Sequence, residues 1–121
     1  PNVQYNGEKN SLRIITSLGT KEVGGTAPEI EIFETTNVLY QKWNHIVINY
    51  DGGNMDVFLN GELVGSKPNI APYMTYENVT SGQDSGIHGG ICNVVYYDHI
   101  LSNNNIQLMY KLLRDKEFPT L

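Results

Sequence analysis

The sequence contains little cysteine, few basic residues and no long apolar run. The single Cys92 excludes an internal disulfide. Eight Lys and Arg against thirteen Asp and Glu give a net charge of −5, which argues against nucleic-acid binding because phosphate recognition needs clustered positive charge. No apolar stretch approaches the roughly 20 residues of a membrane-spanning helix. We therefore expect neither a nucleic-acid partner nor a membrane span.

The sequence also lacks the common cofactor motifs. Its three histidines are too dispersed for zinc-ligand spacing, and no phosphate-binding loop or dinucleotide fingerprint is present. At 121 residues and 40% apolar composition, the chain has the usual size of one domain with a hydrophobic core. We expect a single domain over residues 1–121 that carries no cofactor.

The stretch 43–64 has the clearest pattern, which predicts a β-hairpin followed by a second tight turn. Apolar and polar residues alternate with a period of two over 45–50 and again over 56–60. The cluster 51–54, Asp-Gly-Gly-Asn, is typical of a turn, and Asn60-Gly61 is a strong type I′ turn signal. Trp43, at the start of the hairpin, is expected to anchor the core.

Other segments predict further strands and one helix. Residues 11–17, 28–36 and 90–97 have strand character, the last as a nearly continuous apolar run that suggests a buried strand with a packed Cys92 thiol. Residues 66–80 read as a long connection with one short strand at 73–76. From Ser102, a predicted N-cap, the apolar period becomes helical. We expect the following side chains to be largely buried: Ile46, Ile48, Tyr50, Val57, Leu59, Val94, Ile106 and Met109.

The order of these pieces resembles a known family. A Trp-initiated hairpin closed by Asn60-Gly61 is followed by Gly89-Gly90-Ile91-Cys92-Asn93-Val94-Val95-Tyr96-Tyr97-Asp98-His99-Ile100-Leu101-Ser102 and a short helix. This set resembles the laminin G-like, concanavalin A-like lectin/glucanase domains over residues 38–113, and more loosely over 11–17. The resemblance implies an all-β antiparallel sandwich of jelly-roll type with one short C-terminal helix.

The family's opening strands are not recognisable in the sequence. We therefore expect the chain to be the C-terminal portion of such a sandwich, because a jelly roll without those strands would expose strand edges that natural proteins cover or pair. The resemblance and the continuous apolar run at 90–97 together predict that upstream sequence or a partner chain supplies a completing strand.

The resemblance implies a non-catalytic, lectin-like module that recognises carbohydrate or protein, outside the cell or at its surface. An alternative is a structural component of a large assembly, such as the minor capsid protein of a giant virus, located in the virion. A remote alternative is a glucanase-like hydrolase, because 29–34 is similar to the catalytic strand of retaining glucanases with this fold. We expect Glu29, Glu31 and Glu34 not to converge on a cleft.

Candidate ligand and metal residues lie in loops. Sugar recognition commonly uses an exposed aromatic beside amides and carboxylates, and the long loop offers Tyr73, Tyr76, Asn78 and Gln83 for this role. The same tyrosines could instead pack the loop over the sandwich. Many relatives in the resembled family bind Ca²⁺ at a loop rim, for which Asp51 and Asp84 are the candidate carboxylates. For Asp51, a turn residue that bonds its own backbone is the plainer interpretation.

Overall fold

The computed structural model describes residues 1–19, 28–72, 80–82 and 89–115. The chain divides into two compact units, each of which is built from two segments. The first comprises Pro1–Asn37 and Ala71–Tyr96, and the second comprises Val38–Ile70 and Tyr97–Leu121.

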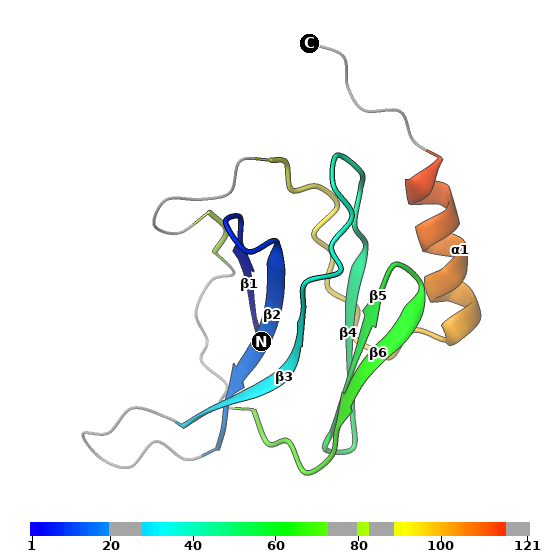
Figure 1. Cartoon of the computed structure of the whole chain (residues 1–121). Coiled ribbons are helices and arrows are strands. Elements are labelled where there is room, and N and C mark those ends of the chain that lie inside the picture. Colours follow the sequence, from blue (N-terminus) through cyan, green and yellow to red (C-terminus); the bar gives the residue numbers. More distant parts are fainter. Residues whose placement is uncertain (20–27, 73–79, 83–88, 116–121) are drawn as a thin grey trace. The chain divides into compact units, whose positions relative to one another are not determined.

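The first unit contains a three-stranded antiparallel sheet, ordered β1-β2-β3 (Figure 1). Its strands are β1 (Asn2–Asn6), β2 (Ser11–Ser17) and β3 (Glu29–Thr35). The central strand β2 has the bounds that the sequence predicts and is mostly buried, whereas every residue of the edge strand β1 is exposed. The apolar core of this sheet consists of Leu12, Ile14, Ile15 and Ile32.

A β-bulge interrupts the pairing of β2 with β3. Ile14 lies opposite Phe33 and Ile15 opposite Glu31, so Ile32 is the extra residue of the bulge. Ile32 is buried while Glu31 and Glu34 are both exposed. The bulge therefore breaks the simple alternation of the sequence pattern in this strand.

The second unit contains another three-stranded antiparallel sheet, ordered β4-β5-β6. Its strands are β4 (Ile46–Asp51), β5 (Asn54–Leu59) and β6 (Glu62–Lys67). Gly52 and Gly53 turn the chain with φ of 54° and 87°, and Asn60 and Gly61 do so with φ of 53° and 84°. The predicted hairpin and the predicted Asn60-Gly61 turn are both confirmed.

Helix α1 (Asn103–Arg114) lies along the β4-β5-β6 sheet (Figure 1). Ser102 is its N-cap, as predicted, and its hydroxyl accepts a hydrogen bond from the Asn105 amide at 3.2 Å. Ile106 packs with Phe58 of β5 and Leu101. Before the helix begins, the Asn49 side chain donates to the Leu101 carbonyl at 2.9 Å and accepts from the Leu101 amide at 3.2 Å. These two bonds fix the start of the helix against β4.

The predicted core is confirmed in part. Val57, Leu59 and Ile106 are buried, and Ile46, Ile48, Met109 and Trp43 are half-buried. The prediction for Tyr50 was wrong, because its side chain is 46% exposed. Tyr50 lies near the end of β4, where its hydroxyl donates to the Ile70 carbonyl at 3.0 Å and the ring is left partly in solvent.

The prediction of a buried strand over 90–97 was also wrong. Residues 91–97 form no strand and no hydrogen bond with another described residue, and Val94 is 71% exposed. Asn93 has a φ of 53°, which interrupts an extended backbone, and no described strand pairs with the segment. Cys92 is accordingly exposed and is not a packed core thiol.

The predicted fold class is confirmed. In the described ranges, the chain forms six antiparallel strands in two sheets and one short helix toward the C-terminus. This all-β composition is that of an antiparallel β-sandwich with a C-terminal helix.

The Asn60-Gly61 turn is part of a hydrogen-bond network. The Asn60 amide donates to the His45 carbonyl, and the His45 amide donates to Asn60 Oδ1, both at 2.8 Å. Asn60 Nδ2 donates to Asn44 Oδ1 at 3.1 Å. Asn44 in turn bonds the amide and the carbonyl of Leu39 at 3.0 and 2.9 Å. One turn thereby holds the loop that leads into β4.

We expect Gly61→Ala to destabilise the protein by about 1–2 kcal/mol, because an L-residue is strained at the φ of 84° that Gly61 adopts. The added Cβ would also lie 3.3 Å from the Tyr110 ring of α1. Gly7→Ala is the matched control, since its Cβ would meet only Tyr5, at 3.8 Å. Urea denaturation measures both variants, and equal free energies of unfolding would contradict the assignment.

His45 should make stability depend on pH. Burial lowers the pKa of His45 from its ordinary value of 6.5, and its buried Nδ1 has no hydrogen-bond partner among the described residues. The unfolded chain takes up a proton near pH 6.5, whereas the folded chain does so only at lower pH. The contribution of neutral His45 is therefore complete above pH 6.5 and is lost as the pH falls through the folded-state pKa.

Urea denaturation between pH 7.5 and 5.5 tests this expectation. His45→Gln should flatten the decline in the free energy of unfolding. A wild-type stability that stays constant over this range, or an NMR midpoint for His45 at or above its ordinary value, would refute it.

Candidate functional site

Three polar side chains form a row across the β1-β2-β3 sheet. Gln4 of β1 lies directly opposite Arg13 of β2, and Arg13 lies directly opposite Glu34 of β3. Directly opposed residues of antiparallel strands project from the same face, so an amide, a guanidinium and a carboxylate stand side by side. All three residues are exposed.

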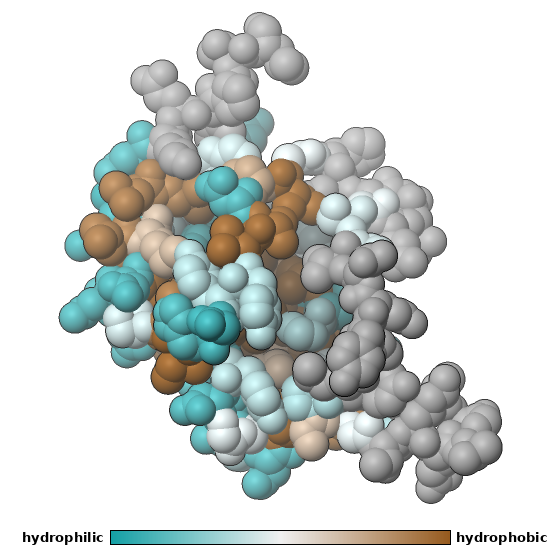
Figure 2. Space-filling model, turned by 180° about the vertical axis from the view of Figure 1, so that it is seen from behind, coloured by the Kyte–Doolittle hydropathy of each residue, from teal (hydrophilic) through white to brown (hydrophobic). Residues whose placement is uncertain are grey.

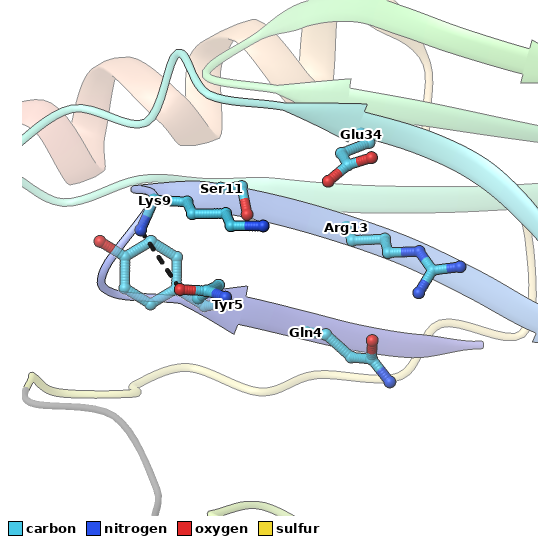
Figure 3. A pocket seen from close by; sticks show the side chains of 7 residues that line it. Gln4, Tyr5, Lys9, Ser11, Arg13 and Glu34 are labelled. Atoms are coloured by element: carbon cyan, nitrogen blue, oxygen red, sulfur yellow. Dashed lines mark hydrogen bonds between the residues drawn. The ribbon is translucent and has the colours of Figure 1, made fainter.

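This row forms one wall of a pocket of about 360 Å³ (Figure 3). We call it the polar-row pocket; its lining residues are Gln4, Tyr5, Asn6, Lys9, Ser11, Arg13 and Glu34. Figure 3 shows the Lys9 and Arg13 side chains extending over the sheet, with the Tyr5 ring at the turn end. The volume is in the range of small-molecule sites and is sufficient for a monosaccharide unit.

The β1–β2 turn positions the two residues at this end of the pocket. Asn6 Oδ1 accepts hydrogen bonds from the backbone amides of Glu8, at 3.0 Å, and Lys9, at 3.2 Å. The Tyr5 hydroxyl donates to Asn10 Oδ1 at 2.8 Å. Asn10 is buried with a φ of 50°, a conformation that asparagine tolerates better than most residues. The turn thus orders both the Tyr5 ring and the Lys9 backbone.

The charged groups of the pocket are only partly paired. Arg13 Nε donates to Glu31 Oε2 at 2.8 Å. This pair is exposed, so it orients the guanidinium more than it stabilises the fold. Glu34 forms no ion pair with Lys9 or Arg13.

The pocket offers donors and acceptors suited to a polyhydroxylated ligand. The amide of Gln4 and the hydroxyl of Ser11 can both donate and accept, the carboxylate of Glu34 accepts, and the two cations donate. Across the described parts of the chain, no three His, Cys, Asp or Glu side chains gather in a group that could hold a metal.

The residues predicted for ligand binding lie outside the described ranges. These are Tyr73, Tyr76, Asn78 and Gln83, together with the metal candidate Asp84. Asp51 is the exposed last residue of β4 and lies opposite Asn54, the first residue of β5. Of the three strand glutamates, Glu34 alone lines the polar-row pocket, while Glu31 is paired with Arg13.

Sequence reasoning missed β1 and therefore missed the pocket. The segment 2–6, Asn-Val-Gln-Tyr-Asn, alternates with a period of two and runs directly into Gly7. An Asn-Gly pair before the predicted strand 11–17 is a hairpin signal. The turn that forms differs from Asn60-Gly61, because Asn10 rather than Asn6 or Gly7 adopts the positive φ. That signal would have identified β1, although the cross-strand register of Gln4, Arg13 and Glu34 depends on the bulge in β3.

The sequence comparison agrees with this architecture. Residues 2–107 match the family model Laminin G 3, described as the concanavalin A-like lectin/glucanases superfamily. The chain belongs to this superfamily. The match extends to β1, which the resemblance in the sequence alone did not include. No curated protein matches the chain.

One crystal structure is similar to this superfamily member, with a TM-score of 0.48 and 16% sequence identity. It is an S-layer domain-containing protein (residues 221–444) from Clostridium thermocellum ATCC 27405. The alignment covers 90% of this chain and 61% of that one, so the chain spans less than two thirds of the similar structure.

Laminin G-like domains of the superfamily bind carbohydrate or protein, are typically non-catalytic, and are typically extracellular or surface-associated. The superfamily also includes glucanases. Within the described residues, no helix has the length and apolarity needed to cross a membrane.

Proposed function

We propose that the chain is a non-catalytic module that binds carbohydrate in the polar-row pocket. The observation that carries this proposal is that Gln4, Arg13 and Glu34, which share one face of the sheet, line one pocket of about 360 Å³ together with Tyr5 at the turn end. An aromatic ring offers an apolar surface to the face of a sugar ring. Amide, guanidinium and carboxylate groups around it can bond the hydroxyls of the sugar. Membership of the lectin/glucanases superfamily supports this ligand class.

The arrangement of the glutamates supports a binding role over hydrolysis. Retaining glycoside hydrolysis needs two carboxyl groups about 5–5.5 Å apart that face the bond to be cleaved. Glu34 lines the pocket, but neither Glu29 nor Glu31 does, and Glu31 is occupied by Arg13. We propose an extracellular or cell-surface location, which is typical of laminin G-like domains.

Screening the chain against an immobilised glycan panel tests the proposal. Tyr5→Ala should weaken binding of any retained glycan by about tenfold, because it removes an aromatic contact worth about 1 kcal/mol or more. Tyr40→Ala is the matched control: Tyr40 is 72% exposed and does not line the pocket, so its replacement should leave affinity unchanged. Circular dichroism checks that both variants fold.

Failure of the panel to retain the chain, or equal affinities of wild type and Tyr5→Ala, would refute the pocket as a sugar site.

Glu29→Gln tests the absence of catalysis. It should bind as wild type does, and neither protein should release reducing ends from a β-glucan. Hydrolysis that disappears in Glu29→Gln would make the chain an enzyme.

The segment 91–97 favours a second role, in which a strand from further sequence or from a partner chain completes the sheet structure. Figure 2 shows apolar side chains (brown) at the surface among hydrophilic ones (teal). The exposed apolar residues include Ile91, Val94, Val95, Tyr96 and Tyr97. Their backbone groups have no hydrogen-bond partner among the described residues. β-branched and aromatic residues with free backbone groups favour strand addition.

Amide hydrogen exchange tests strand completion. In the isolated 121-residue chain, the amides of 91–97 should exchange without protection, whereas the β5 amides should be protected. In a longer protein that contains additional upstream sequence, or in an oligomer, protection should extend to 91–97. A cooperatively melting monomer of the isolated chain with these amides already protected would contradict strand completion.

A further inference from the structure

Two cationic groups in the polar-row pocket have donors that no described residue satisfies. Lys9 donates a hydrogen bond to Asn6 through its backbone amide, and its side-chain ammonium forms no ion pair with a described residue. Arg13 uses only Nε, in its bond to Glu31, so its terminal guanidinium nitrogens remain available. A guanidinium carries five N–H donors in a planar fork, of which this bond occupies one.

The Arg13–Glu31 bond also pre-orients the guanidinium. A guanidinium held through Nε keeps its plane fixed and presents its Nη edge to a ligand, which lowers the entropic cost of a further bidentate contact. Lys9 extends over the same side of the sheet (Figure 3). The pocket lining combines two cations with one carboxylate, Glu34. A second carboxylate, Glu31, bonds Arg13 Nε but does not line the pocket, so the Lys9 ammonium and the Nη groups of Arg13 are the cationic donors left for a ligand.

We infer that the polar-row pocket selects sugars that carry a carboxylate, as hexuronic acids do. This inference rests on the proposed carbohydrate-binding function. Arg13 and Lys9 bind the carboxylate of the sugar, Tyr5 contacts its ring, and Gln4 and Glu34 bond its hydroxyls. A planar carboxylate matches the fork of Arg13 in a bidentate contact. A neutral sugar would offer no anionic partner to the Lys9 ammonium or to the Nη groups of Arg13.

The probes are oligogalacturonate, oligomannuronate and oligoglucuronate, each paired with its fully methyl-esterified form. Esterification removes the negative charge and keeps every ring hydroxyl. Isothermal titration calorimetry should show that at least one acid form binds about tenfold or more tighter than its ester, since hydrogen bonds between charged groups are stronger than those to a neutral ester. The affinity of the acid should fall between 20 and 200 mM NaCl because exposed charge pairs are screened.

Variants assign the effect to the pocket. Lys9→Gln should lower the affinity for the acid about tenfold and lower the affinity for the ester by less. Arg13→Lys keeps the positive charge but removes the planar guanidinium. It should also lower the affinity for the acid more than the affinity for the ester. Lys67→Gln is the matched control, because Lys67 is an exposed cation at the end of β6 that does not line the pocket. It should bind both forms as wild type does.

The outcomes separate this inference from the proposed function. If acid and ester bind equally through Tyr5, or if neutral or sulfated glycans bind while the uronates do not, carboxylate selection is refuted and the sugar site stands. If no oligosaccharide binds, the proposed function itself fails. If the acid is preferred and Lys9→Gln and Arg13→Lys leave that preference unchanged, the selection lies elsewhere and the assignment to this pocket is refuted.

Discussion

The reversal of the chain at Asn60-Gly61 is the constraint on which the second unit depends. The positive φ of both residues sets the register between β5 and β6, and the Asn60 side chain bonds His45 and Asn44. Gly61 lies against Tyr110 of α1 so closely that a methyl group would meet the ring at 3.3 Å. A single turn therefore fixes a sheet register, a loop conformation and the approach of a helix. No residue with a side chain satisfies the two requirements at Gly61 without strain.

Helix α1 covers side chains that the alternation in the strands places on the outer face. The alternation in 45–50 and 56–60 suggests one inward and one outward set of side chains, yet Phe58 is as well buried as its neighbours. It is buried because Ile106 and Leu101 cover it, with Val47 and Met109 packed against the same cluster. The Asn49–Leu101 hydrogen bonds hold the residue that precedes the helix against β4. A polar side chain in the middle of a strand thus serves to fix a helix to the sheet.

The two candidate interaction regions of the chain have opposite chemistry. The polar-row pocket is ordered by strand register and by the Asn6 and Asn10 bonds of the β1–β2 turn, and its groups are charged or polar. The segment 91–97 carries no charge, exposes apolar side chains and has unpaired backbone groups. The first suits a small hydroxylated ligand, and the second suits another polypeptide strand. The two proposed roles would therefore use different groups of the chain.

The sequence by itself determined the local structure of this protein. The Asn-Gly pair identified the turn at Asn60-Gly61, and the apolar and polar pattern of 11–17 gave the bounds of β2. The change from a strand period to a helical period located α1, with Ser102 as its N-cap. These features depend on dihedral preferences and on hydrogen bonds between residues close in the chain, which the local sequence fixes. The family resemblance to lectin/glucanase domains followed from the order of the same local signals.

Tertiary structure decided which side chains meet. The bulge at Ile32 brings Glu31 and Glu34 to the same exposed side of the sheet, and β1 brings Gln4 beside Arg13, so the pocket exists only through pairing between separate segments. The exposure of Val94 was decided in the same way, because a strand-forming sequence is buried only where a neighbouring strand satisfies its backbone. Pairing over long sequence separations depends on the whole packed arrangement, and no local preference encodes it.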